Sequence, residues 1–506
     1  MKKSTLYFFI IFFMNIFNNA FALTVDEFMD KNFAPVSDGI ARIIFYEINF
    51  FGVSIPVIIL WALIGGIFFT VYFKGISVWG FKHAVDLIIK PHKSSNNDNC
   101  GEVSSFQALA TALSGTIGIG SIAGVAISIS IGGPGAALWI FIGAFFGMSL
   151  KFVEAVLAVK YRRFNEDGTI SGGPMHYIAH GLTRKKLRWL GQPLSVLYAI
   201  LCIGGGITGG NMIQINQSAH QFLFITGGEH SFLYGSTWVF GLIVSVLVGM
   251  VTVGGIKSIA RITTVLVPTM CFMYIISGLI VIAVNFLNIP SALLLIIKEA
   301  FHPTAVAGGA IGTLVIGLRR SIQSNEAGTG AAAIVYATAQ TKEPVTQGFV
   351  ALLETFLTGV LCLFTSCTII FTGSCTAATK EISGIELASR AFESVIPFFP
   401  VILSIIAILF ALSTLISWAY YGQKAWTFLF GEGKKRALMF NLIYCVFIVI
   451  GSVMNVKSVI NITDAMMVAL CLPNIITLYV LCPEVKKDLI SYCKKFKFTK
   501  VYGNEK

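Results

Sequence analysis

The stretch that decides the fold runs Ala112-Leu-Ser-Gly-Thr-Ile-Gly-Ile-Gly-Ser-Ile-Ala-Gly124. It is apolar enough for a membrane helix, but glycines recur in its middle, and a glycine inside a helix costs about 1 kcal/mol relative to alanine. Similar clusters lie roughly 190 residues further along the chain, at Ala307-Gly-Gly-Ala-Ile-Gly312 and Ser324-Asn-Glu-Ala-Gly-Thr-Gly330. The sequence therefore predicts two interrupted membrane helices.

The composition is that of a membrane protein. Of the 506 residues, 56% are hydrophobic and only 12% are charged, whereas soluble domains carry about 25% charged residues. The mean hydropathy is +0.81. Apolar runs of about 20 residues, the length of a membrane-spanning helix, recur along the chain, and a helix satisfies its own backbone in lipid. We expect an all-α polytopic membrane protein.

The apolar runs predict about eleven membrane spans. They lie near residues 53–73, 105–130, 134–160, 193–222, 234–255, 263–286, 305–336, 346–372, 396–420, 437–453 and 460–482. Lys2 and Lys3, a short apolar stretch and Ala20-Phe-Ala22 precede them, which is typical of a cleavable signal peptide. An uncleaved first helix is the alternative.

Basic residues concentrate on one side of the predicted spans, and Lys and Arg mark cytoplasmic loops. We therefore interpret the net charge of +12 as a consequence of topology and expect no nucleic-acid partner. The expected location is the bacterial inner membrane, with the mature N-terminus outside and the C-terminus in the cytoplasm. The expected regions are the signal peptide (1–22), an extracytoplasmic segment with an accessory helix and a cytoplasmic loop (23–103), the transporter core (104–482) and a basic tail (483–506).

The two interrupted helices become the first and sixth helices of the core if the core begins near residue 105. A five-plus-five inverted repeat would make them symmetry mates, and such pairs point to a transport site at the midplane. Free N–H groups at a helix break suit a carboxylate, and free carbonyls suit a cation. The breaks thus predict a site for an amino-acid zwitterion together with a cation. Close packing through small residues is the alternative explanation for the glycines.

A series of short motifs follows in order along the chain. They are Phe106-Gln-Ala-Leu-Ala-Thr-Ala-Leu113, Ile122-Ala-Gly-Val-Ala126, Gly132-Gly-Pro-Gly-Ala136, Lys151-Phe-Val-Glu154, Ala158-Val-Lys-Tyr161, Gly172-Gly-Pro-Met175, Gly210-Asn-Met-Ile-Gln214, Ser324-Asn-Glu-Ala-Gly328, Ser413-Thr414, Trp418-Ala-Tyr-Tyr-Gly422 and Pro473-Asn474. Through them, nearly the whole mature chain resembles the alanine or glycine:cation symporter family (sodium:alanine symporters), a branch of the leucine-transporter fold.

The resemblance implies a substrate site and a sodium site. Backbone amides at the first break would hold the substrate carboxylate, a glutamine would assist, and a tryptophan would form one wall of a small side-chain pocket. The implied substrate-binding residues are Gly118, Ile119, Gly120, Ser121, Gln214 and Trp418. The sodium ion would lie between carbonyls and hydroxyls of Ser114, Ile117, Ser413 and Thr414. Such oxygen-only ligation suits a hard cation.

Two positions near each break depart from the family pattern. Ile119 and Ser121 flank Gly120 where the family usually has Thr and Asn. Ser321 and Gln323 stand where it tends to have Gly and Phe. We therefore expect the pocket and the ion coordination to differ from those of the family.

Charged residues inside spans are functional candidates. Lys151 and Glu154 have the i, i+3 spacing that favours a local ion pair over a proton relay. Glu326 lies beside a break, and a gating role and an ion pair with Arg319 or Arg320 are both open.

Several polar residues have a structural interpretation beside the functional one. Asp464 is expected at a helix start near the outer surface. Asn211, three residues before Gln214, hydrogen-bonds either the substrate or a neighbouring helix. Cys367 and Cys375 both approach an extracytoplasmic loop, where a disulfide is left open.

The sequence predicts a secondary active transporter, namely a Na⁺-coupled symporter that brings a small neutral amino acid (alanine or glycine-like) into the cell. A proton-coupled transporter of a different amino acid is the nearest alternative, and Ser413 and Thr414 favour Na⁺. A channel or a membrane-embedded enzyme is a more distant alternative. We expect no enzymatic activity, no organic cofactor and no nucleotide.

Overall fold

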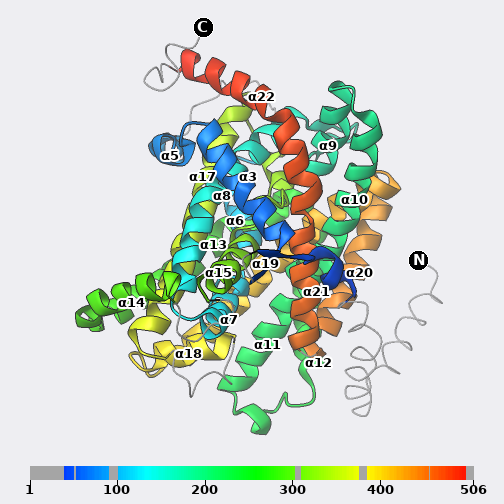
Figure 1. Ribbon diagram of the computed structural model, residues 1–506. Coiled ribbons are helices and arrows are strands. Elements are labelled where there is room, and N and C mark those ends of the chain that lie inside the picture. The colour runs from blue at the N-terminus through cyan, green and yellow to red at the C-terminus, as the bar shows by residue number, and fades with distance from the viewer. Residues whose placement is uncertain are drawn as a thin grey trace, which may run out of the picture.

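Figure 1 shows the computed structural model of the chain, which is mainly helical. It describes residues 39–50, 53–90, 101–302, 309–374, 384–454 and 456–496. The all-α prediction is confirmed; two short antiparallel strand pairs complete the described part. The predicted signal peptide and Cys375 lie outside the described residues, so the signal peptide stays a prediction and the disulfide stays open.

An accessory segment precedes the core. The strands β1 (Glu47–Phe50) and β2 (Val53–Pro56) pair antiparallel and lead into α3 (Val57–Tyr72). The short helices α4 (Ile76–Trp79) and α5 (Phe81–Ile89) follow after a bend of 67°.

The core and its peripheral helices make up most of the chain. Apart from the two broken helices, its elements are α8 (Ala136–Lys160), β3 (Arg163–Phe164), β4 (Ile170–Ser171), α9 (Pro174–Arg184), α10 (Arg188–Ile207), the π-helical turn η2 (Thr208–Met212), α11 (Ile213–Ile225), η3 (Gly228–His230), α12 (Thr237–Val253), α13 (Gly255–Val284), η4 (Phe286–Asn288), α14 (Ile289–Phe301), α17 (Pro344–Phe371), α18 (Ile385–Glu393), α19 (Phe399–Phe430), α20 (Lys434–Val453), α21 (Val456–Ala469) and α22 (Cys471–Lys495). In the described part, 7 helices are long and apolar enough to cross a membrane, or up to 9 with bent pairs counted as spans. The number of about eleven spans therefore stays a prediction.

The first predicted interruption is present. The helix α6 (Ser105–Thr116) starts with a capping box between Ser104 and Gln107, and it ends within the glycine-rich stretch. A 3₁₀ turn, η1 (Ile119–Ser121), connects it to α7 (Ala123–Gly132), and the two parts are bent by 63°.

The second predicted interruption is present at the glycine cluster of residues 324–330. The helix α15 (Gly309–Asn325) begins within the first cluster and includes Gly312, and residues 303–308 before it lie outside the described part, so an interruption at that cluster stays a prediction. The chain leaves the helix at Glu326, which has φ +53°, and resumes in α16 (Ala333–Tyr336). Gly328 and Gly330 also have positive φ, of +88° and +77°, which explains why the break needs glycine at these positions.

Helix packing brings both breaks to the centre of the molecule. The helix α6 packs against α13 and α19, while α15 packs against α7 and α8. Figure 1 shows α7 and α18 at the end of the molecule opposite the C-terminal part of α22. The two breaks therefore lie between elements that reach opposite ends of the bundle.

Candidate functional site

A pocket of about 310 Å³ lies beside the first break. It is lined by residues of the α6–α7 break, η2, α11, α15, α19 and α21. The lining includes five of the predicted site residues, Gly118, Ile119, Gly120, Gln214 and Trp418. Both halves of the core thus contribute to one cavity.

Gln214 holds the first break in position. Its Oε1 accepts a hydrogen bond from the Ile119 backbone N–H at 3.0 Å, while its Nε2 donates to the Gly209 carbonyl at 3.0 Å. A Cβ at Gly118 would lie 2.7 Å from the Gln214 Oε1 and 2.9 Å from the Thr414 Oγ1. Glycine is therefore needed at position 118 for both side chains to approach the backbone this closely.

The predicted sodium ligands are only partly brought together. The Thr414 hydroxyl donates to the Ser114 carbonyl at 2.8 Å, and the Ser114 hydroxyl donates to the Ser413 carbonyl at 3.3 Å. The Ser413 hydroxyl instead donates to Phe410 in its own helix. Ile117 is fully buried at the end of α6. The arrangement offers oxygen atoms from α6 and α19, which fit a hard cation such as Na⁺.

Sequence reasoning missed one hydroxyl in this cluster. Ser417 lies within hydrogen-bond distance of the Ser114 hydroxyl, and it donates to the Thr111 carbonyl at 3.1 Å. Ser417 follows Thr414 by three residues and Ser413 by four, and this spacing places all three hydroxyls on one face of a helix, which could have identified it from the sequence.

Trp418 connects the two breaks. Its indole N–H lies 3.3 Å from the Gly115 carbonyl and 3.2 Å from the Glu326 Oε1, and can donate to both. The ring packs directly on the backbone of Gly210 in η2, where a Cβ would lie only 2.1 Å from it. Trp418 is therefore a wall of the pocket that also fixes Glu326.

Ser121 and Asn211 are not among the residues that line the pocket. The Ser121 hydroxyl is buried without a partner in the described part of the chain, and its carbonyl accepts from Thr365 at 3.1 Å. Asn211 donates to the Tyr444 carbonyl at 2.8 Å, which corresponds to the helix-bonding interpretation.

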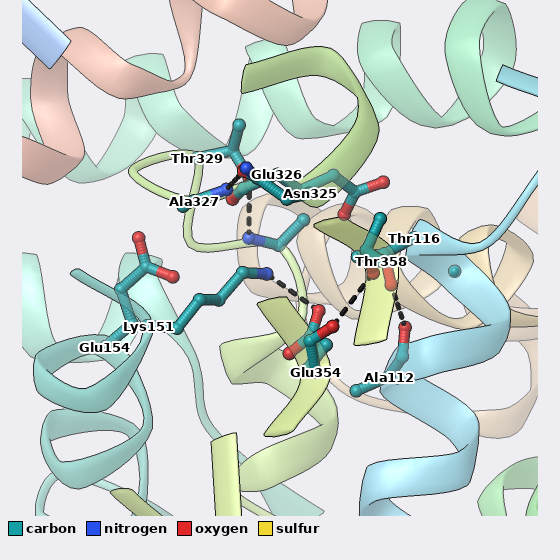
Figure 2. A network of polar contacts seen from close by, with 12 residues as sticks. Ala112, Thr116, Lys151, Glu154, Asn325, Glu326, Ala327, Thr329, Glu354 and Thr358 are labelled. Carbon is teal, nitrogen blue, oxygen red and sulfur yellow. Dashed lines mark hydrogen bonds and ion pairs between the residues drawn. The ribbon is translucent and has the colours of Figure 1, made fainter. Parts of the chain in front are cut away.

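A buried polar network supports the second break, whose residues Asn325, Glu326, Ala327 and Thr329 are labelled in Figure 2 together with Glu154. Glu154 accepts from the Gly328 backbone N–H and from the Asn474 amide, both at 2.9 Å. The Asn474 amide also donates to the Gly328 carbonyl at 2.8 Å. Side chains from α8 and α22 therefore satisfy backbone groups that the break has freed, which lets the helix end here.

The predicted local pair between Lys151 and Glu154 is wrong. Lys151 forms its ion pair with Glu354 of α17 at 2.9 Å, and both side chains are almost fully buried. Figure 2 shows Lys151 extending to Glu354, with Glu154 directed elsewhere. The reason is that Glu154 is used by the freed backbone at Gly328, so the lysine needs another anion.

The contacts exclude one alternative that was open for Glu326 and correct the prediction for Asp464. Arg319 pairs with Asp464 at 2.7 Å, so it is not the partner of Glu326. Arg320 donates from Nε to the Ser324 hydroxyl at 3.1 Å. Asp464 lies inside α21 and lines the pocket, so its expected place at a helix start is wrong. Helix α21 begins earlier than its apolar residues indicate.

One face of α15 contributes polar residues to the pocket that the sequence did not reveal as a group. Their spacing along the helix follows the i, i+3 and i, i+4 pattern of a single face. The pocket-lining residues of α15 and its end are Ile316, Arg319, Arg320, Gln323 and Glu326. Ser321, the other departure on this helix, is buried facing α8, where a Cβ at Gly143 would lie 2.6 Å from its hydroxyl.

Comparisons with known proteins agree with this geometry. The sequence profile described as the sodium:alanine symporter family matches residues 38–504. The sodium/alanine symporter AgcS of Methanococcus maripaludis is 34% identical over 426 residues, which cover 84% of this chain and 91% of AgcS. The probable sodium/glutamine symporter GlnT of Bacillus subtilis is 34% identical over 436 residues, covering 85% and 87%.

A solved structure has the same fold. The crystal structure of MhsT in complex with L-phenylalanine aligns with a TM-score of 0.55 and 13% sequence identity, covering 75% of this chain and 89% of MhsT. The predicted leucine-transporter-like architecture, with its five-plus-five core and broken helices, is confirmed.

Proposed function

The chain belongs to the sodium:alanine symporter family, and we propose that it is a secondary active transporter that couples Na⁺ entry to the uptake of a small neutral amino acid. Members of this family are transporters and not enzymes. The names of the relatives indicate alanine for AgcS and glutamine for GlnT, so relatives of similar identity differ in substrate. Alanine and glycine are the first candidates because the family is named for them.

One observation carries the proposal. The first break places the oxygen cluster of Ser114 and Thr414 directly beside the backbone of Gly118, which lines the pocket. Freed N–H groups on one side of the break suit the carboxylate of an amino acid. Oxygen atoms on the other side suit Na⁺. The same few residues can therefore hold both ligands.

This proximity supplies the coupling. A sodium ion held by the Ser114 carbonyl and the Thr414 hydroxyl would tie α6 to α19 and fix the position of Gly118. Fixing that backbone orders the amides that receive the substrate. By linkage, a substrate that needs the same ordered backbone strengthens Na⁺ binding by the same factor.

We propose that the pocket faces the outside of the cell. It extends along α7 to Ile131, at the side that the charge distribution predicts to be extracytoplasmic. At the opposite side, Lys160 pairs with Asp488 at 2.7 Å and Lys185 pairs with Glu484 at 3.1 Å. These contacts join the segments around α8 and α9 to α22, and uptake would require them to open. The inner membrane is the proposed location.

One observation favours the proton-coupled alternative. The carboxylate of Glu326 lines the pocket, and its Oε2 is buried without a hydrogen-bond partner in the described part of the chain. A carboxylate in this position is able to bind a proton on one side of the membrane and release it on the other during the transport cycle. The hydroxyl and carbonyl cluster around Ser114 favours Na⁺ as the coupling ion, and the proton is the second candidate.

The test is uptake by the purified protein in liposomes. A panel of radiolabelled amino acids is offered with an inward Na⁺ gradient, with K⁺ in place of Na⁺, and with an inward proton gradient. We expect accumulation of a neutral amino acid only with the Na⁺ gradient. Equal accumulation with a proton gradient alone would assign the coupling to protons, and no accumulation under any gradient would refute the proposed substrate class.

A further inference from the structure

The polar face of α15 contains groups that the proposed function does not use. Arg319 is neutralised by Asp464 at 2.7 Å, and Arg320 is held by the Ser324 hydroxyl at 3.1 Å. Gln323 lies on the same face, directed to the pocket between Arg320 and the end of the helix. An amide in this position is not needed for binding either the carboxylate or the sodium ion.

Gln323 is incompletely hydrogen-bonded. It lines the pocket, yet its Nε2 is buried with no hydrogen-bond partner among the described residues. Buried polar side-chain atoms are nearly always hydrogen-bonded, and exceptions point to a missing partner. A half-turn about the terminal side-chain torsion, which is broad and two-fold, would exchange Oε1 and Nε2 and turn the donor to the pocket.

Glu326 provides a matching acceptor. Its Oε1 accepts from Trp418 at 3.2 Å, and its Oε2 is buried without a partner in the part of the chain that the structure describes. Gln323 and Glu326 both line the pocket, so a single bound group can contact both side chains. After the half-turn, the pocket face would offer the Gln323 amide as a donor beside the carboxylate of Glu326 as an acceptor.

We propose that Gln323 determines specificity and that the substrate is a neutral amino acid with a hydrogen-bonding side chain, either a hydroxyl or a carboxamide. Such a side chain accepts from the Gln323 amide and donates to Glu326. The inference rests on the proposed function and narrows it within the neutral amino acids, away from alanine and glycine.

The pocket lining balances Arg319 and Arg320 against Asp464 and Glu326, so its net charge gives no preference for a charged side chain. A carboxylate side chain would meet the carboxylate of Glu326. A basic side chain would meet Arg320, whose guanidinium lies 3.3 Å from a Cβ position at Gly120 in the pocket. A purely apolar side chain would leave the Gln323 amide without an acceptor. Because the pocket also admits water, we expect discrimination of about tenfold and not the much larger factor of a dry site.

The experiment compares isosteric pairs as competitors of Na⁺-driven uptake of labelled serine in liposomes. Serine is paired with 2-aminobutyrate and asparagine with leucine, since each pair differs mainly in its hydrogen-bonding atoms. We expect the polar member to have an inhibition constant about tenfold lower. The pair with the larger ratio tells whether a hydroxyl or a carboxamide fits better.

The variant Gln323→Met keeps the length of the side chain and removes its amide. We expect the ratio within each pair to fall towards one, while the inhibition constant of the apolar member changes less than twofold. Gln347→Met is the matched control, because Gln347 is buried in α17 with its amide atoms unpartnered in the described part, and it does not line the pocket. If a variant does not transport, the ratio is measured by displacement of labelled serine in detergent with Na⁺.

Two results would overturn the inference alone: equal constants within both wild-type pairs, or an unchanged ratio in Gln323→Met, each with intact Na⁺-driven uptake. If no neutral amino acid accumulates with Na⁺, the proposed function fails and the inference falls with it.

Discussion

The substitution Gly118→Ala tests whether substrate and sodium share one segment. Gly118 has φ −101°, which alanine adopts freely, so the variant introduces no backbone strain. Its methyl group would lie 2.7 Å from the Gln214 Oε1 and 2.9 Å from the Thr414 Oγ1. Both distances are shorter than real carbon contacts allow, so at least one of the two side chains must move.

The expected magnitude follows from the hydrogen bonds that would be lost. Moving Gln214 breaks its 3.0 Å bond from Ile119, and moving Thr414 breaks its 2.8 Å bond to Ser114. Each buried hydrogen bond contributes about 1 kcal/mol, and together they contribute about 2 kcal/mol. Since 1.4 kcal/mol corresponds to a factor of ten, we expect apparent affinity to weaken about fivefold if one side chain moves and about 30-fold if both do, divided between amino acid and Na⁺.

The assay measures initial uptake rates in liposomes over a matrix of amino-acid and Na⁺ concentrations. Gly249→Ala, inside α12, is the control, because the only contact given for a Cβ there is the Cys445 Sγ at 3.4 Å, an ordinary distance. It should retain wild-type affinities. The reasoning is refuted if Gly118→Ala keeps both affinities within threefold of wild type, or if only one ligand is affected while the other binds normally.

Three further predictions concern single contacts. Thr414→Ala should raise the Na⁺ concentration for half-maximal uptake about tenfold, because it removes a proposed Na⁺ ligand. Thr427→Ala in the same helix is the control and should leave this concentration unchanged. Similar shifts in both variants would contradict the ion site. Glu354→Gln should lower the free energy of unfolding by about 3–5 kcal/mol, because it leaves the Lys151 charge buried and unpaired, and an unchanged melting temperature in detergent would contradict this. Glu484→Gln should raise the KM for external substrate by no more than about fivefold, because its ion pairs are partly exposed, and loss of all uptake would show a larger role.

The first break and the residues around it could be predicted from the sequence. Glycines at close intervals inside an apolar run weaken the helix wherever it lies, so the interruption near Gly118 depends on local sequence. Gln214 and Trp418 came from the resemblance, and both line the pocket. At the other cluster, α15 begins at Gly309 and includes Gly312, so a glycine there is compatible with helix, because a glycine permits a break and does not require one.

The partners of the charged residues could not be predicted. The i, i+3 rule paired Lys151 with Glu154, but both side chains bond groups that are distant in sequence, Glu354 and Gly328. Local spacing describes a solvated helix surface, whereas a buried charge pairs with whatever the tertiary packing brings near it.

The polar face of α15 was missed for a related reason. Gln323 was recognised only as a departure from the family pattern, and its position on the pocket depends on how α15 faces α7 and α11. Arg319 and Asp464 are far apart in sequence, and their pairing within the pocket lining likewise depends on the packing of α15 against α21.

The central claim is that one broken segment binds Na⁺ and an amino acid together, so that the flux of one drives the other. The most direct measurement is uptake of radiolabelled sodium (²²Na⁺) into liposomes that contain the protein, driven only by an inward gradient of unlabelled neutral amino acid. We expect the amino-acid gradient to accelerate ²²Na⁺ entry in the wild type and not in Thr414→Ala. Amino-acid entry without any accompanying ²²Na⁺ would contradict the account.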